Sequence, residues 1–399
     1  MRKALVVTLF SLCASVVCAQ EERSMIIGGD TLSYRYTPID QSDSSIRDGG
    51  SGRSFLEPIP IGDNGYLSYM VAPLYSTETN FGLAAALNYS KFGANEASLS
   101  AADAVKKSDI TLFVYGSISG CYAFDIEGSC RLDKRGIQHL SYGGNIGSEP
   151  SRIWGVDYLS ALNGERRSYT EKECSAWLRY ALVFGDFSVG VHLDYRYLRT
   201  LNLDEGAMEI LDAQRLRIST AGIAVFSEFD MRTRGGNDGV MRGIYAMIEG
   251  SCRPKFLGNI GADILQFRAA FDYYQPLWRG AMVALDIYGE TTSSNTPWLL
   301  LPQMGGDSRM RGYYIGRFRG DNLVFAQVEL RQHIWRGIGV AAWGGAGVVY
   351  NRGERFAWSR VLPTYGAGLR YRYDQLTIRF DVAFGRCGHT FILGLNEAF

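Results

Sequence analysis

The segment Val324–Ile334, "VFAQVELRQHI", alternates apolar and polar side chains with the two-residue period of a β-strand. Successive side chains of a strand point to opposite faces of the sheet, so Val328 and Leu330 share one face. Glu329 and Arg331 lie on the opposite face. The segment therefore predicts a strand with one apolar face and one face that carries both signs of charge.

Segments 189–197, 265–273 and 375–385 repeat this alternation. A soluble β-sandwich also alternates, with its apolar face turned inward. Here the apolar face is continuous and rich in Tyr and Phe near the strand ends, in a chain with 24 Tyr and 20 Phe. Apolar residues that face lipid and polar residues that face water are typical of a transmembrane β-barrel, whose tilted strands need about 9 to 11 residues to cross. The pattern favours this barrel over the sandwich.

Counting such segments predicts an all-β fold: a transmembrane antiparallel β-barrel of about 16 strands over residues 66–399. The long links join odd strands to even ones, so we expect them outside the cell, and most of the other links are tight, as periplasmic turns are. The expected strands are residues 66–75, 80–92, 109–118, 121–132, 136–146, 173–185, 187–200, 213–228, 240–252, 262–275, 279–290, 322–334, 338–350, 362–373, 375–385 and 389–399; the long links are 147–172, 201–212, 291–321 and 351–361, and the exceptions among the tight turns are 93–108 and 229–239.

The first residues predict export. Arg2 and Lys3 precede an apolar run that ends before Gln20, which is typical of a secretory signal peptide over residues 1–19. A transmembrane anchor needs about 20 apolar residues, and this run is shorter. Together with the barrel, the signal peptide predicts the bacterial outer membrane as the location. Residues 20–65, rich in Ser, Gly and Asp, predict a flexible periplasmic linker.

Composition and motifs argue against several other classes of function. A formal net charge of zero gives no reason to expect nucleic acid as a partner. His192 and Asp194 share an inward face, but no nucleophile is near them and no GxSxG element is present, so we do not expect an enzyme. The cysteines show no paired CxxC pattern, and we expect no metal and no other cofactor. An odd number of cysteines follows the signal peptide, so at least one thiol is free or bonded outside the chain: Cys121, Cys130, Cys174, Cys252 and Cys387.

The segment Gly305–Asn322, "GGDSRMRGYYIGRFRGDN", lies in the link 291–321 and carries four arginines. Its Met310-Arg311-Gly312-Tyr313 resembles the (V/I)RG(F/Y) motif at the tip of the sixth loop in the BamA/TamA superfamily, whose barrels insert or translocate outer-membrane proteins. Other stretches that resemble this family are "APLYSTETNFGLAAAL" at 72–87, "FSEFDMRTR" at 226–234, "AQVELR" at 326–331 and "GAGLRYRY" at 366–373, so that the resemblance covers most of residues 58–399.

The resemblance implies that the loop 291–321 folds back into the lumen and that an acidic residue on the inner wall holds Arg311. Glu329 is the candidate partner, because a guanidinium in a partly dehydrated lumen needs a carboxylate and offers it a rigid fork. The family has a second acidic site on the thirteenth strand, where this chain has Gly345. We therefore expect a weaker or differently connected clamp. The alternative is a surface loop whose arginines bind the phosphates of lipopolysaccharide.

The chain ends with "HTFILGLNEAF". This end resembles the C-terminal signal by which outer-membrane barrels are handed to the insertion machinery, with Phe399 last and Glu397 at a place that is usually apolar. In an extended final strand, Phe399 shares its face with Phe391, Leu393 and Leu395.

The expected function is assistance with the insertion or translocation of proteins or lipids. The first and last strands of such a barrel meet at a seam that can open sideways, and Pro73 removes one hydrogen-bond donor there. Family members carry periplasmic POTRA domains ahead of the barrel, where this chain has its linker. We therefore expect a periplasmic partner that captures the client, besides contact with outer-membrane lipids and lipopolysaccharide. The alternative is a passive barrel or a plugged channel.

Overall fold

The computed structural model describes residues 59–62, 64–76, 79–92, 106–234, 240–354, 357–373 and 376–399. The expected signal peptide and most of the expected linker 20–65 lie outside these residues. The end of that linker is not all linker, because Ile59–Ile61 form the short strand β1, which pairs with β2.

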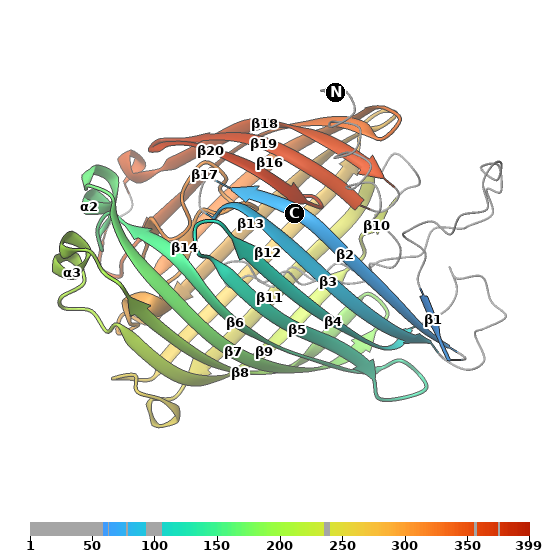
Figure 1. The fold of residues 1–399 in the computed structure, drawn as a ribbon, viewed down its shortest axis with the longest axis horizontal. Coiled ribbons are helices and arrows are strands. Elements are labelled where there is room, and N and C mark those ends of the chain that lie inside the picture. Colours follow the sequence, from blue (N-terminus) through green and yellow to red (C-terminus); the bar gives the residue numbers. More distant parts are fainter. Residues whose placement is uncertain are drawn as a thin grey trace.

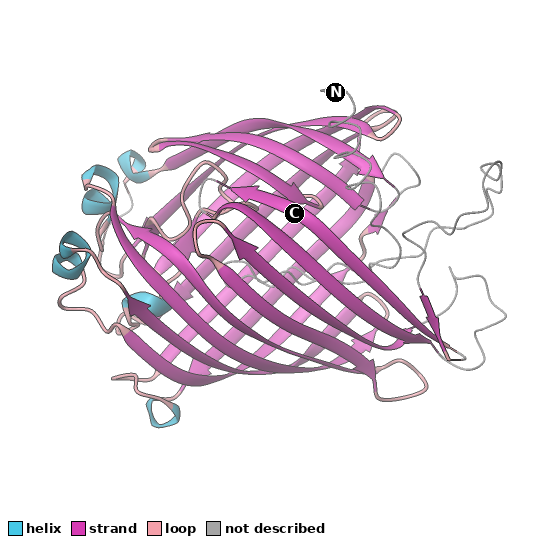
Figure 2. Ribbon diagram, in the orientation of Figure 1, coloured by secondary structure: helices cyan, strands magenta, loops and turns pink. Residues whose placement is uncertain are grey.

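Sixteen long antiparallel strands form a closed barrel, as the sequence predicts (Figures 1 and 2). Each strand pairs with the next along the chain, and β20 pairs with β2 to close the wall. The strands are β2 (Gly65–Ser76), β3 (Asn80–Phe92), β4 (Lys106–Ser117), β5 (Tyr122–Arg131), β6 (Gln138–Ile153), β7 (Arg167–Phe184), β8 (Phe187–Leu201), β9 (Arg217–Asp230), β11 (Met241–Arg253), β12 (Ile264–Pro276), β13 (Ala281–Thr292), β16 (Asn322–Trp335), β17 (Ile338–Tyr350), β18 (Leu362–Tyr373), β19 (Leu376–Gly385) and β20 (Gly388–Leu395).

Most strand ends lie within a few residues of the expected ones, with two clear differences. β6 and β7 continue their ladder as far as the pair Ile153↔Arg167, so the expected link 147–172 is much shorter than predicted. The final strand was predicted to reach residue 399, which is wrong: β20 ends at Leu395, because Asn396 has a φ of 62° and turns the chain out of the strand.

The helices gather at one end of the barrel, with the long links (Figure 2). Asp157 and Asp204 begin α2 and α3 by accepting hydrogen bonds from backbone N–H groups of the first turn. The bonds from Ser168 and Ala207 hold the pKa of Asp204 below its usual range. In the described part of the chain, none of the helices is long and apolar enough to cross a membrane. The helical elements are α2 (Tyr158–Asn163), α3 (Glu205–Ile210), η1 (Lys255–Leu257), η2 (Trp298–Leu300) and η3 (Trp358–Arg360).

Three short strands complete the loops and turns. β10 (Thr233–Arg234) pairs with the first two residues of β11, at the end of the barrel opposite the helices. β14 (Gln303–Met304) and β15 (Phe318–Arg319) pair with each other and close the loop that carries the four arginines. The segment between β14 and β15 therefore forms a hairpin-like loop whose two ends are hydrogen-bonded to each other.

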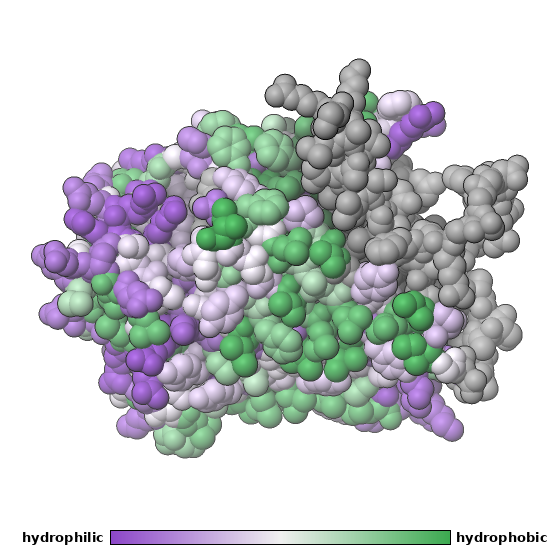
Figure 3. Space-filling view, viewed as in Figure 1, coloured by the Kyte–Doolittle hydropathy of each residue, from purple (hydrophilic) through white to green (hydrophobic). Residues whose placement is uncertain are grey.

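The two faces of the wall differ as the alternation predicts. On β16, Val324 and Val328 are each 45% exposed, whereas Glu329 has no exposed surface. Apolar side chains cover the outside of the wall between two more polar ends (Figure 3). Buried charged side chains such as Glu329 and Asp381 lie inside, where they pair with Arg311. This inside-out arrangement fits a wall that is surrounded by lipid.

We predict that Val225→Arg, on the outer face of β9, lowers the free energy of unfolding in lipid vesicles by about 2 to 4 kcal/mol, because a charge near the middle of the bilayer loses its hydration. Met208→Arg in α3 is the matched control, since both wild-type residues are 59% exposed. We expect the control to change stability by less than about 0.5 kcal/mol. Urea titration of the reconstituted protein measures both variants, and equally small losses would show that the outer face of β9 meets water.

Candidate functional site

Arg311 lies at the centre of the site and has no exposed surface. Its guanidinium pairs with Glu329 of β16 and, at 2.8 Å, with Asp381 of β19. The same group lies over the Trp343 ring of β17, with its carbon 3.6 Å from the ring centre. One side chain of the loop therefore contacts three strands of the inner wall.

The second carboxylate on Arg311 is thus not on the strand that the family resemblance implies. Gly345 of β17 leaves that place without a side chain, and Asp381 supplies the charge two strands further along the chain. A cation over an indole face and two carboxylates on one guanidinium are both favourable contacts. The clamp is therefore differently connected, and the expectation that it is weaker finds no support in these contacts.

The residues beside Arg311 fit the wall closely. Gly312 has a φ of 102°, and a Cβ there would come within 2.7 Å of the main-chain carbon of Phe384, so only glycine fits. The Tyr313 hydroxyl donates to the Pro363 carbonyl at 2.6 Å. Burial raises the pKa of Tyr313 to about 12, which keeps this donor protonated. Met310 is fully buried. All four motif residues are held by the protein itself.

The other three arginines of this loop also have internal partners. Arg309 lies 3.3 Å from Asp286 of β13, and Arg317 donates to the Ala161 carbonyl of α2 at 2.9 Å. Arg319 lies over the Trp298 ring, 4.1 Å from its centre. Of the four, only Arg317 is more than slightly exposed. A surface loop that binds phosphates needs free guanidinium groups, and these contacts oppose that alternative.

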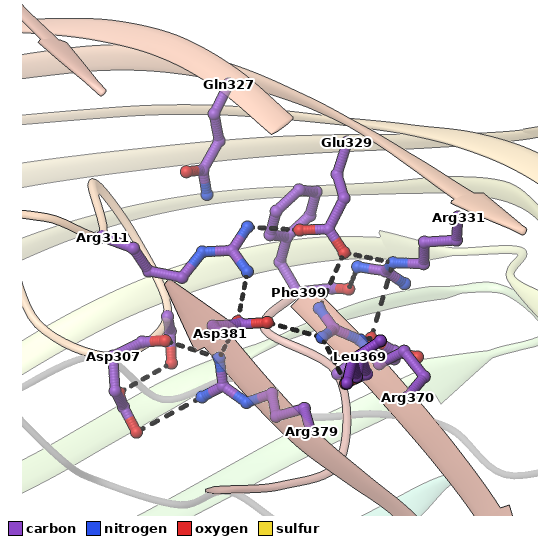
Figure 4. A network of polar contacts seen from close by, with 12 residues as sticks. Asp307, Arg311, Gln327, Glu329, Arg331, Leu369, Arg370, Arg379, Asp381 and Phe399 are labelled. Atoms are coloured by element: carbon purple, nitrogen blue, oxygen red, sulfur yellow. Dashed lines mark hydrogen bonds and ion pairs between the residues drawn. The ribbon is translucent and has the colours of Figure 1, made fainter. Parts of the chain in front are cut away.

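The charge pairs continue along the inner wall (Figure 4). Glu329 also accepts from Arg331 at 2.7 Å and from Arg370 at 3.4 Å. Arg370 in turn donates to Asp381 at 2.5 Å. Each carboxylate is shared by several guanidinium groups, so the removal of one member leaves buried charges without their full set of partners.

The C-terminal residues join this network instead of continuing β20. Glu397 lies 2.8 Å from Arg370 and 3.7 Å from Arg331. Arg331 also donates to the main-chain oxygen of Phe399 at 2.8 Å. Phe399 is fully buried in a cluster with Tyr274 and Met282. The departure at Glu397 from the usual apolar residue therefore has a physical role, because this carboxylate pairs with arginines inside the barrel.

The prediction that Phe399 shares a strand face with Phe391, Leu393 and Leu395 is wrong. Phe391 is 36% exposed and Leu393 and Leu395 are partly exposed on β20, whereas Phe399 lies in the interior. The turn at Asn396 separates Phe399 from the other three. The use of these residues as an assembly signal stays a prediction.

Sequence reasoning missed Asp381 and Arg370 as members of the site. Both occupy the polar face of strongly alternating segments, which marks them as inward. Alternation does not say which inward charges meet across the lumen, so their pairing with Arg311 and Glu329 could not be read from the sequence.

His192 and Asp194 belong to a separate group of inner-wall charges. The His192 Nδ1 lies 3.7 Å from Glu249, and Asp194 accepts from Arg253 at 2.6 Å. They contact these partners and not each other. Cys121, Cys130, Cys174, Cys252 and Cys387 are all free thiols. Across the described ranges, no cluster of three or more His, Cys, Asp or Glu side chains could hold a metal ion.

Comparison with known proteins places the fold. No protein-family model and no curated protein matches the sequence. Among solved structures, BamA from Haemophilus ducreyi lacking POTRA domains 1–3 matches 84% of this chain and 71% of its own, at 15% identity and a TM-score of 0.54. This chain has the fold of a BamA-type barrel. CdiB from Acinetobacter baumannii matches 84% of this chain at 14% identity and a TM-score of 0.54. CdiB from Escherichia coli matches 83% of this chain, also at 14% identity, with a TM-score of 0.55. The chain spans only 60% and 63% of these two CdiB chains.

The seam of this BamA-type barrel is short. β2 and β20 share two register pairs, Tyr75↔Leu393 and Ser76↔Ile392. On its other side β2 pairs with β3 along its whole length. Much of the β2 edge therefore has no β20 partner in the part of the chain that the structure describes.

We predict that Arg311→Ala lowers the free energy of unfolding by about 3 to 5 kcal/mol, because it leaves Glu329 and Asp381 buried with one cation fewer. Arg311→Lys should recover part of the loss, since an ammonium keeps the charge but not the fork. Arg135→Ala, in an exposed turn, is the control and should change stability by less than about 0.5 kcal/mol. Urea titration in vesicles compares the three variants. An Arg311→Ala variant as stable as the control would refute the clamp.

We predict that Glu397→Gln frees the C-terminal tail, because Arg331 and Arg370 lose a charged partner. The measurement is thiol labelling of Ala398→Cys, which is 1% exposed in the wild type, in a background whose own cysteines are replaced by serine. Labelling should become at least about tenfold faster. This corresponds to a loss of about 1.4 kcal/mol in the free energy that keeps the tail bound to the inner wall. An unchanged rate would mean that the Phe399 packing alone holds the tail.

Proposed function

We propose that this chain assists the insertion or translocation of proteins at the bacterial outer membrane, together with a periplasmic partner that captures the client. The observation that supports the proposal most is the two-pair seam in a barrel of the BamA type. A passive barrel gains stability from a fully paired wall. A seam this short lowers stability, and a seam that has to open for activity would explain that loss.

The edge of β2 beyond its two pairs with β20 offers a template for a client strand. Between Ser68 and Leu74 its backbone has β3 on one side and, among the described residues, no strand on the other. Unpaired N–H and C=O groups at a sheet edge bind an incoming strand by β-augmentation. Pro73 lies within this stretch and offers no donor, which weakens pairing at one position.

The loop 291–321 has a supporting role in this proposal. The contacts of Arg311 with β16, β17 and β19 support a place for the loop tip inside the barrel. We propose that the loop stays in the lumen and keeps this part of the wall rigid while the other side of the seam moves. Removal of the clamp would then impair client insertion as well as stability.

A second candidate function is a plugged channel. The burial of Met310, Arg311 and Tyr313 against the inner wall supports a plug. In that case the seam has no role in the activity, and release of the plug is the functional event. The two proposals therefore differ in which part of the barrel has to open.

A disulfide across the seam separates them. We predict that Tyr75→Cys with Leu393→Cys, once oxidised, slows the folding of an unfolded outer-membrane barrel into proteoliposomes at least tenfold, since a locked seam cannot accept a strand, and that a reductant restores the rate. Val71→Cys with Ala85→Cys, a register pair of β2 and β3, is the matched control and should leave the rate unchanged. Serines replace the native cysteines in both.

The results decide between the two proposals. If the seam disulfide leaves insertion at the wild-type rate, the seam is not the route. If the client barrel folds into proteoliposomes that contain the wild type no faster than into protein-free liposomes, assistance with insertion is refuted. Ion conductance in planar bilayers that rises alike in Arg311→Ala, Glu329→Ala and the double variant would then support the plugged channel.

A further inference from the structure

A row of basic side chains crosses three neighbouring strands on the outside of the barrel. Lys172 of β7 lies directly opposite Arg199 of β8, and Arg199 lies directly opposite Arg217 of β9. All three side chains are exposed. They share their faces with the apolar outer residues Leu178, Leu193 and Ile223, so they point away from the lumen.

These charges lie close together without protein partners. Residues directly opposite each other on neighbouring strands have Cβ atoms about 5 Å apart, and like charges in such pairs destabilise the sheet. Among the described residues, none of the three forms an ion pair with an acidic side chain; Arg217 has only the Tyr197 ring, 5.4 Å from its guanidinium carbon. An anion from outside the protein would relieve this repulsion.

The height of the row matches the surface of the membrane. Lys172 and Phe184 lie near opposite ends of β7, about 40 Å apart at about 3.3 Å per residue. A tilt of about 40° reduces this to roughly 30 Å along the barrel axis, while the apolar band of such barrels is about 25 Å tall. Arg199 and Arg217 are equally far from Phe187 and Phe229, which pair at the other end of β8 and β9. The row therefore lies just above the apolar band, at the end with the long links, which faces outward in bacterial barrels.

An apolar projection lies beside the row. The loop from β11 to β12 folds back against β9, where Asn259 accepts from Ser219 N at 2.9 Å and donates to the Arg217 carbonyl at 3.1 Å. This loop holds Phe256, 80% exposed, and Leu257, 47% exposed. Figure 3 shows a hydrophobic bulge at the lower left, where Figure 1 draws this loop. Exposed apolar side chains next to cations suit a molecule with both acyl chains and phosphates.

We propose that Lys172, Arg199 and Arg217 bind the phosphates of a phosphorylated glycolipid of the outer leaflet, with Phe256 and Leu257 against its acyl chains. Arginine and lysine both bind phosphate, and the outer wall at this height meets the headgroups of that leaflet. The site is separate from the arginine loop, whose guanidinium groups have internal partners. It would hold lipid against β7 to β9, far along the wall from the seam.

Lipid binding by the full chain in detergent tests the site, with bisphosphorylated lipid A as the probe and native mass spectrometry as the readout. Lys172→Gln with Arg199→Gln and Arg217→Gln should lower the affinity at least about tenfold, because each surface cation contributes to the attraction. The matched control changes three exposed cations at the opposite end: Lys107→Gln with Lys134→Gln and Arg135→Gln. It should change the affinity less than twofold. Heat-modified gel mobility shows that both variants are folded.

Other probes separate the sources of phosphate. Phe256→Ser should weaken lipid A binding with the basic row intact, and phosphatidylcholine should bind the wild type and the triple variant equally. Equal losses in the row variant and the control, or no loss in either, would overturn the proposal. So would complete displacement of lipid A by millimolar inorganic phosphate, since the row would then be a site for free phosphate only.

Discussion

The buried guanidinium of Arg311 sets the strictest requirement in this barrel. A charge without exposed surface is stable only where carboxylates and further hydrogen bonds replace its water. Glu329 and Asp381 meet that requirement from two different strands, so the positions of β16 and β19 and of the loop tip depend on one another. The glycine that follows, with its positive φ, is the local adjustment that lets the loop approach the wall so closely.

The same requirement explains the charge pattern of the inner wall. A barrel that presents apolar side chains to lipid has to place its charged residues inside, where water is limited. There each charge costs free energy unless it is paired, and a network in which carboxylates are shared satisfies several arginines at once. Arg331 and Arg370 share both Glu329 and Glu397, so the loop tip and the C-terminal tail form one network and not two.

The sequence predicts the strands well because lipid imposes the two-residue period directly on each of them. The face of Glu329 and the number of strands follow from that period alone. The resemblance of Met310–Tyr313 to the loop motif of the BamA/TamA superfamily points to Arg311 and Glu329 as partners. The role of Asp381 and the inward turn of Phe399 could not be predicted, because they depend on which strands meet in space and on a single positive φ at Asn396. Local alternation contains neither kind of information.

The inward tail keeps the last residues of the chain out of the seam. The register Tyr75↔Leu393, continued along an extended strand, would place Phe399 opposite Tyr69 and lengthen the seam. Instead, Glu397 binds arginines of the inner wall and Phe399 packs beside Tyr274, so these residues cannot also pair with β2. Glu397 and Phe399 thus make contacts inside the barrel in place of pairs with β2, whereas Gly394 and Leu395 stay in β20 and pair with β19. The charge network around Arg311 thus connects β16, β19 and the loop tip, and it also holds C-terminal residues that could otherwise lengthen the seam.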